Sequence, residues 1–229
     1  AEGVMSGNDL LYNNNKINWR KFNNALLMRM LLRVSKKPEF NSYARLKSMI
    51  ADPAKYPVFN SNAEAAIVKI NGIAPYDYSW SRRQDYVNAT AMGEFFVDML
   101  NGLEDPRRAL VMTRASRVVD NSPVDIGFKG IPAGHSGDAS QFNYTPSTPN
   151  GDLMYPSAVG TEIVEIMMSY AEVEFIKAEV ALQTGDLAAA KLAYEQAVTA
   201  AITQWKNGVM PANYFLNEKA AFNGTMEQI

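Results

Sequence analysis

The segment Glu162–Trp205 places the strongest constraint on the fold, because apolar residues recur in it every three or four positions. This periodicity predicts two helices that each bury one face. The pattern is interrupted at Gly185-Asp186. Gly185 can adopt the left-handed conformation that ends a helix, and Asp186 can cap the free N–H groups of the next helix. The segment is therefore predicted to form a helical hairpin.

The packing residues of this hairpin match those of a tetratricopeptide unit. Counted from Gly185, the small and aromatic residues of such a unit fall at Ala178, Ala181, Ala190, Tyr194 and Ala197. Small residues let two helices approach closely and present a face to the next pair. Glu174 and Lys177 depart from the pattern, because the repeat prefers large apolar residues at these positions. A single degenerate unit predicts helical-repeat packing and indicates no ligand.

The rest of the chain continues the helical pattern with little β-structure. We expect helices at 19–34, 40–50 and 90–103, a strand at 66–70, and a turn or short helix capped by Asp105. The helix at 19–34 is so apolar that we expect it to be buried on most sides. Residues 71–86 and 121–156 lack a regular period and are predicted to be long irregular loops. The predicted fold class is mostly α, with tetratricopeptide-like hairpins.

The composition is that of a well-packed globular chain, with 47% hydrophobic and 20% charged residues among 229. The formal net charge is −2 and basic residues cluster only in pairs, so we expect no nucleic-acid partner. The apolar runs are too short for a transmembrane helix, and the first residues lack the features of a signal peptide. Because the chain has no cysteine, it offers no disulfide, thiolate metal site or lipid attachment point.

One predicted loop concentrates aromatic and guanidinium groups: Tyr76, Tyr78, Trp80, Arg82 and Arg83. The apolar face of a pyranose can stack on an exposed ring while polar groups at the rim bind its hydroxyls. The alternative is that Trp80 and one tyrosine plug the loop into the core, and both interpretations remain open. Phe142 and Tyr144 in the second loop form a weaker candidate of the same kind.

The remaining titratable residues predict neither a metal site nor a catalytic site. His135 is the only histidine, and without cysteine or a second histidine it cannot build a zinc site. Glu165, Glu172 and Glu179 recur every seven residues, which predicts one helical stripe. Glycoside hydrolysis instead needs two carboxylates that face each other across the substrate. No residue pattern indicates a cofactor.

Two arginines lie in the apolar helix predicted at 19–34. Arg29 and Arg33 are one helical turn apart, and a guanidinium group in apolar surroundings requires a carboxylate partner. We therefore expect at least one of them to form an ion pair within the helical array, with the glutamate stripe as the source of partners.

A series of short motifs follows the order and approximate spacing of one protein family. The motifs are Asp9-Leu10-Leu11-Tyr12, Trp19, Asn23-Asn24-Ala25-Leu26, Leu27-Met28-Arg29-Met30, Arg33-Val34-Ser35, Ala74-Pro75 with Trp80, Asp105-Pro106-Arg107, Gly130-Ile131-Pro132-Ala133-Gly134, Ala171-Glu172, Ala178-Glu179 and Gly185. Together they resemble the SusD/RagB family of bacterial nutrient-binding outer-membrane lipoproteins, especially its second large subgroup. Each motif is weak alone, but the series covers nearly the whole chain.

The resemblance implies a single SusD-like helical domain over residues 1–229 that binds an oligosaccharide or another nutrient at the cell surface without catalysis. The implied partner is a TonB-dependent outer-membrane transporter of the SusC type, and the implied membrane contact is a lipid anchor outside this chain. Family members begin with a signal peptide and a lipidated cysteine and continue past residue 229, so we expect a fragment. Two alternatives remain, a helical-repeat scaffold for protein–protein interaction and a glycoside hydrolase. The motifs do not name the ligand.

Overall fold

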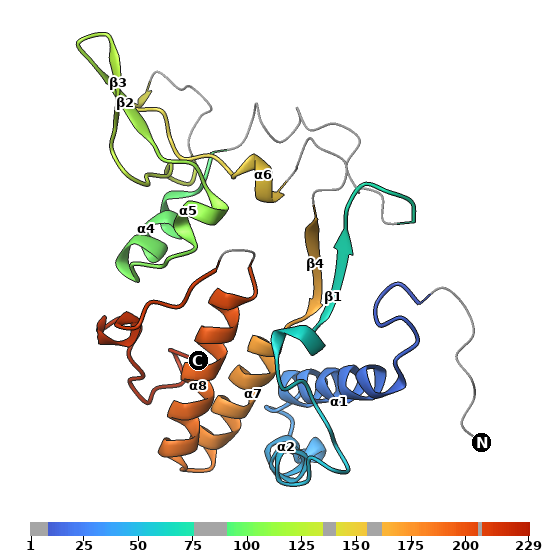
Figure 1. Ribbon diagram of the computed structural model, residues 1–229. Coiled ribbons are helices and arrows are strands. Elements are labelled where there is room, and N and C mark those ends of the chain that lie inside the picture. Colours follow the sequence, from blue (N-terminus) through green and yellow to red (C-terminus); the bar gives the residue numbers. More distant parts are fainter. Residues whose placement is uncertain (1–8, 76–90, 135–140, 155–161, 206–207) are drawn as a thin grey trace. The chain divides into compact units, whose positions relative to one another are not determined.

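A computed structural model describes residues 9–75, 91–134, 141–154, 162–205 and 208–229 (Figure 1). The fold is mostly α-helical, as the sequence predicts. Its helices are α1 (Lys16–Arg33), α2 (Ser42–Ala51), α4 (Glu94–Gly102), α5 (Arg108–Val111), α6 (Gly151–Met154), α7 (Tyr170–Gln183) and α8 (Leu187–Thr203). Short 3-10 helices lie at η1 (Pro38–Phe40), η2 (Asn62–Glu64) and η4 (Tyr214–Leu216). Two separate two-stranded sheets pair β1 (Ala66–Ile70) with β4 (Ile163–Met168), and β2 (Ser116–Val119) with β3 (Ser122–Asp125).

The chain divides into two compact units. The first unit contains residues 1–68, 164–206 and 222–229, and the second contains residues 69–163 and 207–221. The first unit therefore holds α1, α2, α7 and α8, and the second holds α4, α5, α6 and the β2–β3 sheet. No helix in the described ranges is both long and apolar enough to cross a membrane. The expectation of one domain over residues 1–229 stays a prediction.

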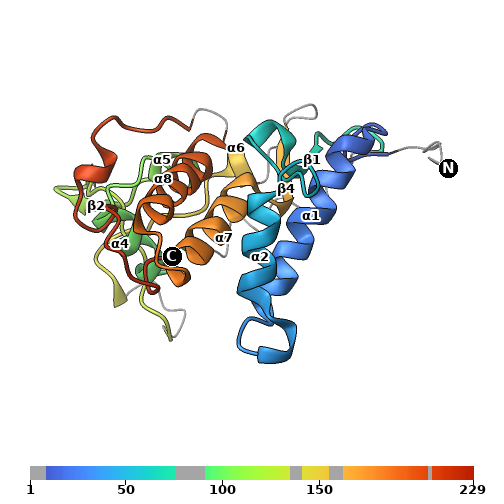
Figure 2. The ribbon, with the colours of Figure 1, turned by 90° about the horizontal axis from the view of Figure 1, so that it is seen from below.

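The predicted hairpin is present as α7 and α8, which lie side by side in both views (Figures 1 and 2). The hydroxyl of Ser169 caps α7 by accepting a hydrogen bond from the Glu172 amide at 3.0 Å. Gly185 follows α7 with φ of +80°, in the left-handed region that the sequence analysis expects. Asp186 then caps α8, because its carboxylate accepts a hydrogen bond from the Ala189 amide at 3.0 Å.

The small residues of this hairpin lie at helix contacts, as predicted. Ala178, Ala190 and Ala197 are fully buried. Tyr194 is also buried, and its ring lies edge-on to Phe175 with centroids 6.1 Å apart. The tetratricopeptide-like packing therefore follows the predicted residues.

The prediction that the first helix of the hairpin begins at Glu162 is wrong, because residues 163–168 form strand β4. Ile163, Val164 and Ile166 are β-branched and lose side-chain freedom in a helix, while they pack well in a strand. The strand also removes Glu165 from the predicted glutamate stripe, since only Glu172 and Glu179 lie on α7.

Helix α1 begins earlier than predicted, because the Asn15 side chain caps it by accepting hydrogen bonds from the amides of Ile17 and Asn18. The expectation that this helix is buried on most sides is wrong. Its buried residues are Asn24, Ala25, Met28 and Leu31, which form a single face, and Met30 is 58% exposed. The helix contacts α2 and α7 through that face.

A buried ion pair explains why α7 departs from the repeat consensus. Glu174 is almost completely buried, and its carboxylate accepts a hydrogen bond from the Lys177 ammonium at 2.6 Å. Lys177 lies three residues after Glu174 on the same face of α7 and neutralises its buried carboxylate. The two departures from the apolar pattern therefore compensate each other.

The second unit has a small core around α4, formed by Val97, Leu100 and Met112. Asp105 is fully buried beside it and accepts a hydrogen bond from the Arg107 amide at 2.8 Å. Its carboxylate also forms an ion pair with the Arg107 guanidinium at 2.6 Å. Asp105 thus closes the turn before α5, but the expectation that it caps the helix is wrong, because the cap position is Arg107 and no side chain caps α5.

Within the stretch 121–156, which the sequence analysis predicts to be an irregular loop, residues 122–125 form strand β3 and residues 151–154 form helix α6. Strand β3 pairs antiparallel with β2, with Ser116 opposite Asp125 and Val119 opposite Ser122. Between them, Asp120 and Asn121 both have positive φ, as a tight two-residue hairpin turn requires. Aspartate and asparagine tolerate this conformation, which is the signal that the irregular-loop interpretation missed.

Candidate functional site

Helix α4 has one buried face and one strongly exposed face. Val97 and Leu100 are buried, whereas the side chain of Phe95 is 84% exposed and that of Met99 is 44% exposed. Gly93 precedes the helix in an extended conformation, so the exposed residues begin within the first helical turn. A phenyl ring this exposed contributes little to packing and is available to a ligand.

A loop is held against the start of α4 by backbone hydrogen bonds. The Ile131 amide donates to the Met92 carbonyl at 2.9 Å, and the Glu94 amide donates to the Ile131 carbonyl at 2.7 Å. Gly130 makes this approach possible, because a Cβ at that position would lie 2.6 Å from the Glu94 nitrogen. The loop and the helix therefore form a fixed wall.

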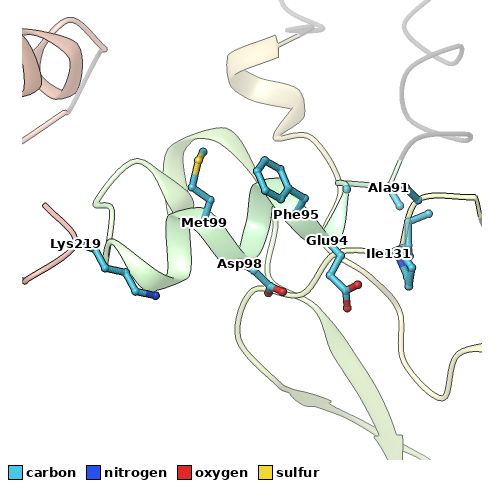
Figure 3. Close-up of a pocket in the computed structure, with 10 residues that line it drawn as sticks. Ala91, Glu94, Phe95, Asp98, Met99, Ile131 and Lys219 are labelled. Carbon is cyan, nitrogen blue, oxygen red and sulfur yellow. The ribbon is translucent and has the colours of Figure 1, made fainter. Parts of the chain in front are cut away.

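This wall borders a hollow of about 770 Å³ along α4 (Figure 3). Its apolar surface comes from Phe95, Met99 and Ile131, and its charged groups come from Glu94, Asp98 and Lys219. In Figure 3, Phe95 and Met99 project from one side of the helix, and Glu94 and Asp98 project from the other. The lining of the hollow thus includes an aromatic ring on one side of α4 and two carboxylates on the other.

The two carboxylates of the hollow lie one helical turn apart on α4. Within the described part of the chain, neither Glu94 nor Asp98 forms an ion pair. Like charges at this spacing destabilise a helix by about 0.2–0.5 kcal/mol. Glu94 opens the first turn of α4, where the helix dipole favours a negative charge by about 0.3–1 kcal/mol, so the pair is no net cost to the helix.

Lys219 lies at the opposite end of α4. The Asn217 side-chain amide donates to the Gly102 carbonyl at 3.1 Å and holds this segment against the helix end. The Lys219 Nζ lies 2.7 Å from the position that a Cβ on Gly102 would occupy. A cation is favourable at the C-terminus of a helix because of the helix dipole. Gly102 is four residues beyond Asp98, so the basic group of the hollow lies one helical turn from the nearer carboxylate.

Residues 1–229 match the model of the SusD-like family described as starch-binding and associating with the outer membrane. The chain belongs to this SusD-like family. Comparison with curated protein sequences gives no match.

Several solved structures share the SusD-like fold. The structure of BT1043 is 25% identical with a TM-score of 0.69, and the match covers 91% of this chain and 39% of BT1043. A Bacteroides vulgatus protein, whose name proposes nutrient binding at the outer membrane, is 22% identical with a TM-score of 0.70, covering 100% and 52%. A chitin-binding protein is 19% identical with a TM-score of 0.67, covering 95% and 48%. The SusD-like chain thus spans about half the length of these proteins or less.

Tyr144, predicted as a site residue, contacts the loop that borders the hollow. Its hydroxyl donates to the Gly130 carbonyl at 2.8 Å, and the Lys129 ammonium lies 4.3 Å from its ring centroid. Burial raises the pKa of the Tyr144 phenol, and the negative charges of Glu94 and Asp98 raise it further. Tyr144 therefore stays a protonated donor close to these two carboxylates.

The ring of Phe142, the weaker aromatic candidate, lies 5.3 Å from the ring of Tyr144. The main predicted cluster, namely Tyr76, Tyr78, Trp80, Arg82 and Arg83, lies outside the described residues, as does His135. Their roles stay predictions. Arg83 precedes Ala91, which lines the hollow, by eight residues in the sequence.

The sequence analysis missed the exposed face of α4, because it used the apolar residues of the segment 90–103 only as evidence for a helix. The available signal was an excess of apolar residues for so short a helix, since Phe95, Phe96 and Met99 are all exposed in addition to the buried face. The acidic pair one turn apart was a second signal. Neither signal alone indicates a ligand, but together they mark a face that is not built for packing.

Proposed function

We propose that this SusD-like chain is a non-catalytic, cell-surface binding protein for a nutrient, and that the nutrient is a glycan. The observation that carries the proposal is Phe95, an 84% exposed ring beside a hollow whose rim holds Glu94 and Asp98. Sugars stack their apolar faces on aromatic rings, and carboxylates accept hydrogen bonds from several hydroxyls. The family description and the chitin-binding relative support a glycan as the ligand class.

The proposed location is the outer membrane, with a lipid anchor outside this chain and delivery of the ligand to a TonB-dependent transporter of the SusC type. The family description, which includes association with the outer membrane, supports this location. The Bacteroides vulgatus relative, named for nutrient binding at the outer membrane, supports it too. The family resemblance supports the transporter as partner, and the two proteins should therefore co-purify.

The segment Tyr76–Arg83 is proposed as a second part of the binding surface. It has the residue types that suit sugar stacking and hydroxyl binding. Its last residue, Arg83, lies eight residues before Ala91, which lines the hollow. In this proposal Tyr144 acts indirectly, by holding the Gly130 carbonyl and thereby the loop that borders the hollow.

A hydrolytic role has weaker support. Glu94 and Asp98 lie on consecutive turns of one helix, and their side chains project in the same direction. A glycosidase instead needs carboxylates on opposite sides of the scissile bond. Of the glutamates considered as candidates, Glu172 binds Arg29, and Glu179 accepts a hydrogen bond from the Tyr43 hydroxyl at 2.7 Å.

A protein–protein scaffold keeps one specific observation in its favour. A second hollow of about 320 Å³ lies in the first unit between α2, α7 and α8. It is lined by apolar residues such as Ile50 and Val180 together with the Glu174–Lys177 pair. This groove lies on the helical repeat, where such scaffolds bind peptides.

The test is Phe95→Ala, with binding to soluble oligosaccharides measured by calorimetry. An aromatic anchor contributes about 2 kcal/mol or more, so the affinity should fall more than tenfold while the melting temperature stays unchanged. Val118→Ala is the matched control, because it truncates another exposed apolar side chain in the second unit, outside the hollow. Equal affinities of Phe95→Ala and the parent chain would reject the site, and release of shortened sugars would indicate a hydrolase.

A further inference from the structure

We propose that the hollow beside α4 is one half of a longer groove, which binds an extended oligosaccharide chain in preference to a disaccharide. This inference rests on the proposed glycan-binding function and adds the chain length of the ligand. A second hollow of about 480 Å³ lies between the end of α4 and η4. Lys219 lines both hollows, and all the lining residues belong to the second unit.

The segment that borders the second hollow is fixed to the end of α4 by buried and polar contacts. Tyr214 is buried, and its hydroxyl donates to a carboxylate oxygen of the buried Asp105 at 3.5 Å. The Asn217 side-chain amide donates to the Gly102 carbonyl at 3.1 Å. The packing of the second unit therefore forms both hollows before any ligand binds, as is usual for ligand sites.

Each hollow presents one large apolar side chain to solvent. Among the large aliphatic and phenyl side chains of the described residues, Phe95 at 84% and Leu216 at 82% are the most exposed. Phe95 lines the first hollow, and Leu216 lines the second. A ligand that covers both side chains removes their apolar surface from water. The two adjoining hollows therefore offer two apolar contacts to one ligand.

Polar groups lie between and beside these two apolar side chains. Because Gly102 has no side chain, the Lys219 ammonium lies against the end of α4, next to both hollows (Figure 3). The second hollow adds the exposed side chains of Glu104 and Asn213. Ammonium and amide groups donate hydrogen bonds, and carboxylates accept them. A sugar chain carries hydroxyls along its whole length and can use both kinds of group.

The separation of the two apolar side chains determines the length of the ligand. Phe95 is seven residues before Gly102, which corresponds to about 10 Å along the helix axis. Leu216 lines the hollow beyond that point, beside Leu103. Each hollow alone has a volume within the range of about 300–1,000 Å³ that suits a drug-sized ligand. A disaccharide therefore occupies one hollow, whereas a chain of several sugar units is needed to contact both.

The test measures binding of a disaccharide and a hexasaccharide to the full chain by calorimetry. The probes are malto-oligosaccharides and N-acetylated chitin oligomers, each compared within its own series. We expect the hexasaccharide to bind more tightly, with one molecule per chain. In Leu216→Ala its affinity should fall about fourfold or more, the equivalent of at least one methylene group withdrawn from the contact. The affinity of the disaccharide, which stacks on Phe95, should not change in this variant.

Val209→Ala is the matched control, because it truncates an aliphatic side chain that is 71% exposed in the same segment, outside both hollows. It should leave both affinities unchanged. Equal affinities of the two lengths for the parent chain, or an unchanged hexasaccharide affinity in Leu216→Ala, would overturn the elongated groove while leaving glycan binding intact. Failure of every oligosaccharide to bind would instead overturn the proposed function on which the inference rests.

Discussion

The guanidinium group of Arg29 donates from Nε and Nη2 to the two carboxylate oxygens of Glu172, each at 2.5 Å. Nη2 also donates to the Met167 carbonyl at 3.0 Å. These contacts join α1 to α7 and to β4 across 143 positions of sequence. The hydrogen bond to Glu172 raises the pKa of Arg29, so the guanidinium group stays ionised. The prediction that one of the two arginines pairs with a carboxylate is confirmed.

Replacement of Arg29 by methionine should destabilise the first unit. Hydrogen bonds to charged groups contribute about 1.5–3 kcal/mol each, and partial exposure of both side chains reduces the total. We expect the free energy of unfolding to fall by about 1–3 kcal/mol in urea denaturation. Arg33→Met is the control, because Arg33 is exposed on the same helix. Similar losses of unfolding free energy in the two variants would show that the contact between Arg29 and Glu172 does not stabilise the fold.

Glu64 should make the stability of the first unit depend on acid pH. Burial alone would raise its pKa, but the hydrogen bond from Lys21 and the one from the Asn60 amide outweigh burial and lower the pKa below 4.5. A carboxylate with a lowered folded-state pKa stabilises the fold above its unfolded pKa, and this contribution is lost as pH falls through the folded value. The unfolding free energy should therefore decrease as pH drops below about 4.5.

Glu64→Gln tests this assignment by urea denaturation at a series of pH values. The variant should be less stable than the parent chain at neutral pH, and the difference should shrink as pH falls, because the parent loses the Lys21 pair on protonation. Glu39→Gln removes an exposed carboxylate that has no ion pair within the described ranges, and it serves as the control. A difference between parent and Glu64→Gln that does not change with pH would contradict the assignment.

Elements with strong local signals were predictable from the sequence. The hairpin of α7 and α8 has its glycine and aspartate at the break, and β1 has a β-branched run. Strand β4 was missed because its apolar residues also fit the helical period that continues into α7. Its strand conformation depends on pairing with β1, a segment far away in the sequence. Periodicity within one segment cannot report such a partner.

The candidate site was predictable only in part, for a related reason. Tyr144 was proposed from its residue type, and in the structure its hydroxyl donates to the carbonyl of Gly130, in the loop beside the hollow. Phe95 was not considered as a site residue, because apolar residues at helical spacing are usually buried. Its exposure follows from which face of α4 meets Met112, and that depends on tertiary packing. The sequence identified the helix but not the direction of its faces.

Gly130 and Gly93 lie close together in space, but only Gly130 should be sensitive to replacement by alanine. A Cβ on Gly130 would meet the backbone of Gly93 and Glu94 at 2.6–2.7 Å, so Gly130→Ala must separate the loop from α4. We expect a loss of about 1–3 kcal/mol in stability, as for overpacked cores, and weaker glycan binding. Gly93→Ala is the matched control, since its φ is −67° and nothing lies within 4 Å of a Cβ there. Equal tolerance of the two substitutions would mean that the close approach does not shape the hollow.

Trp80→Ala distinguishes the two interpretations of the aromatic segment that lies outside the described residues. If Trp80 belongs to the glycan surface, its loss should reduce affinity by about 2 kcal/mol or more without lowering the melting temperature. If it plugs the loop into the core, truncation should instead lower stability by about 3–5 kcal/mol. Calorimetry and thermal unfolding of this one variant therefore separate the two cases.

The double variant Trp80→Ala/Phe95→Ala then tests whether the segment and the hollow bind one ligand. Two residues that contact the same sugar chain without touching each other should have additive effects on affinity, while residues in direct contact should deviate from additivity by about 0.5–3 kcal/mol. We expect both single variants to weaken binding of the same oligosaccharide. Unchanged affinity in a stable Trp80→Ala protein would remove Tyr76–Arg83 from the site, and binding would then depend on the hollow beside α4.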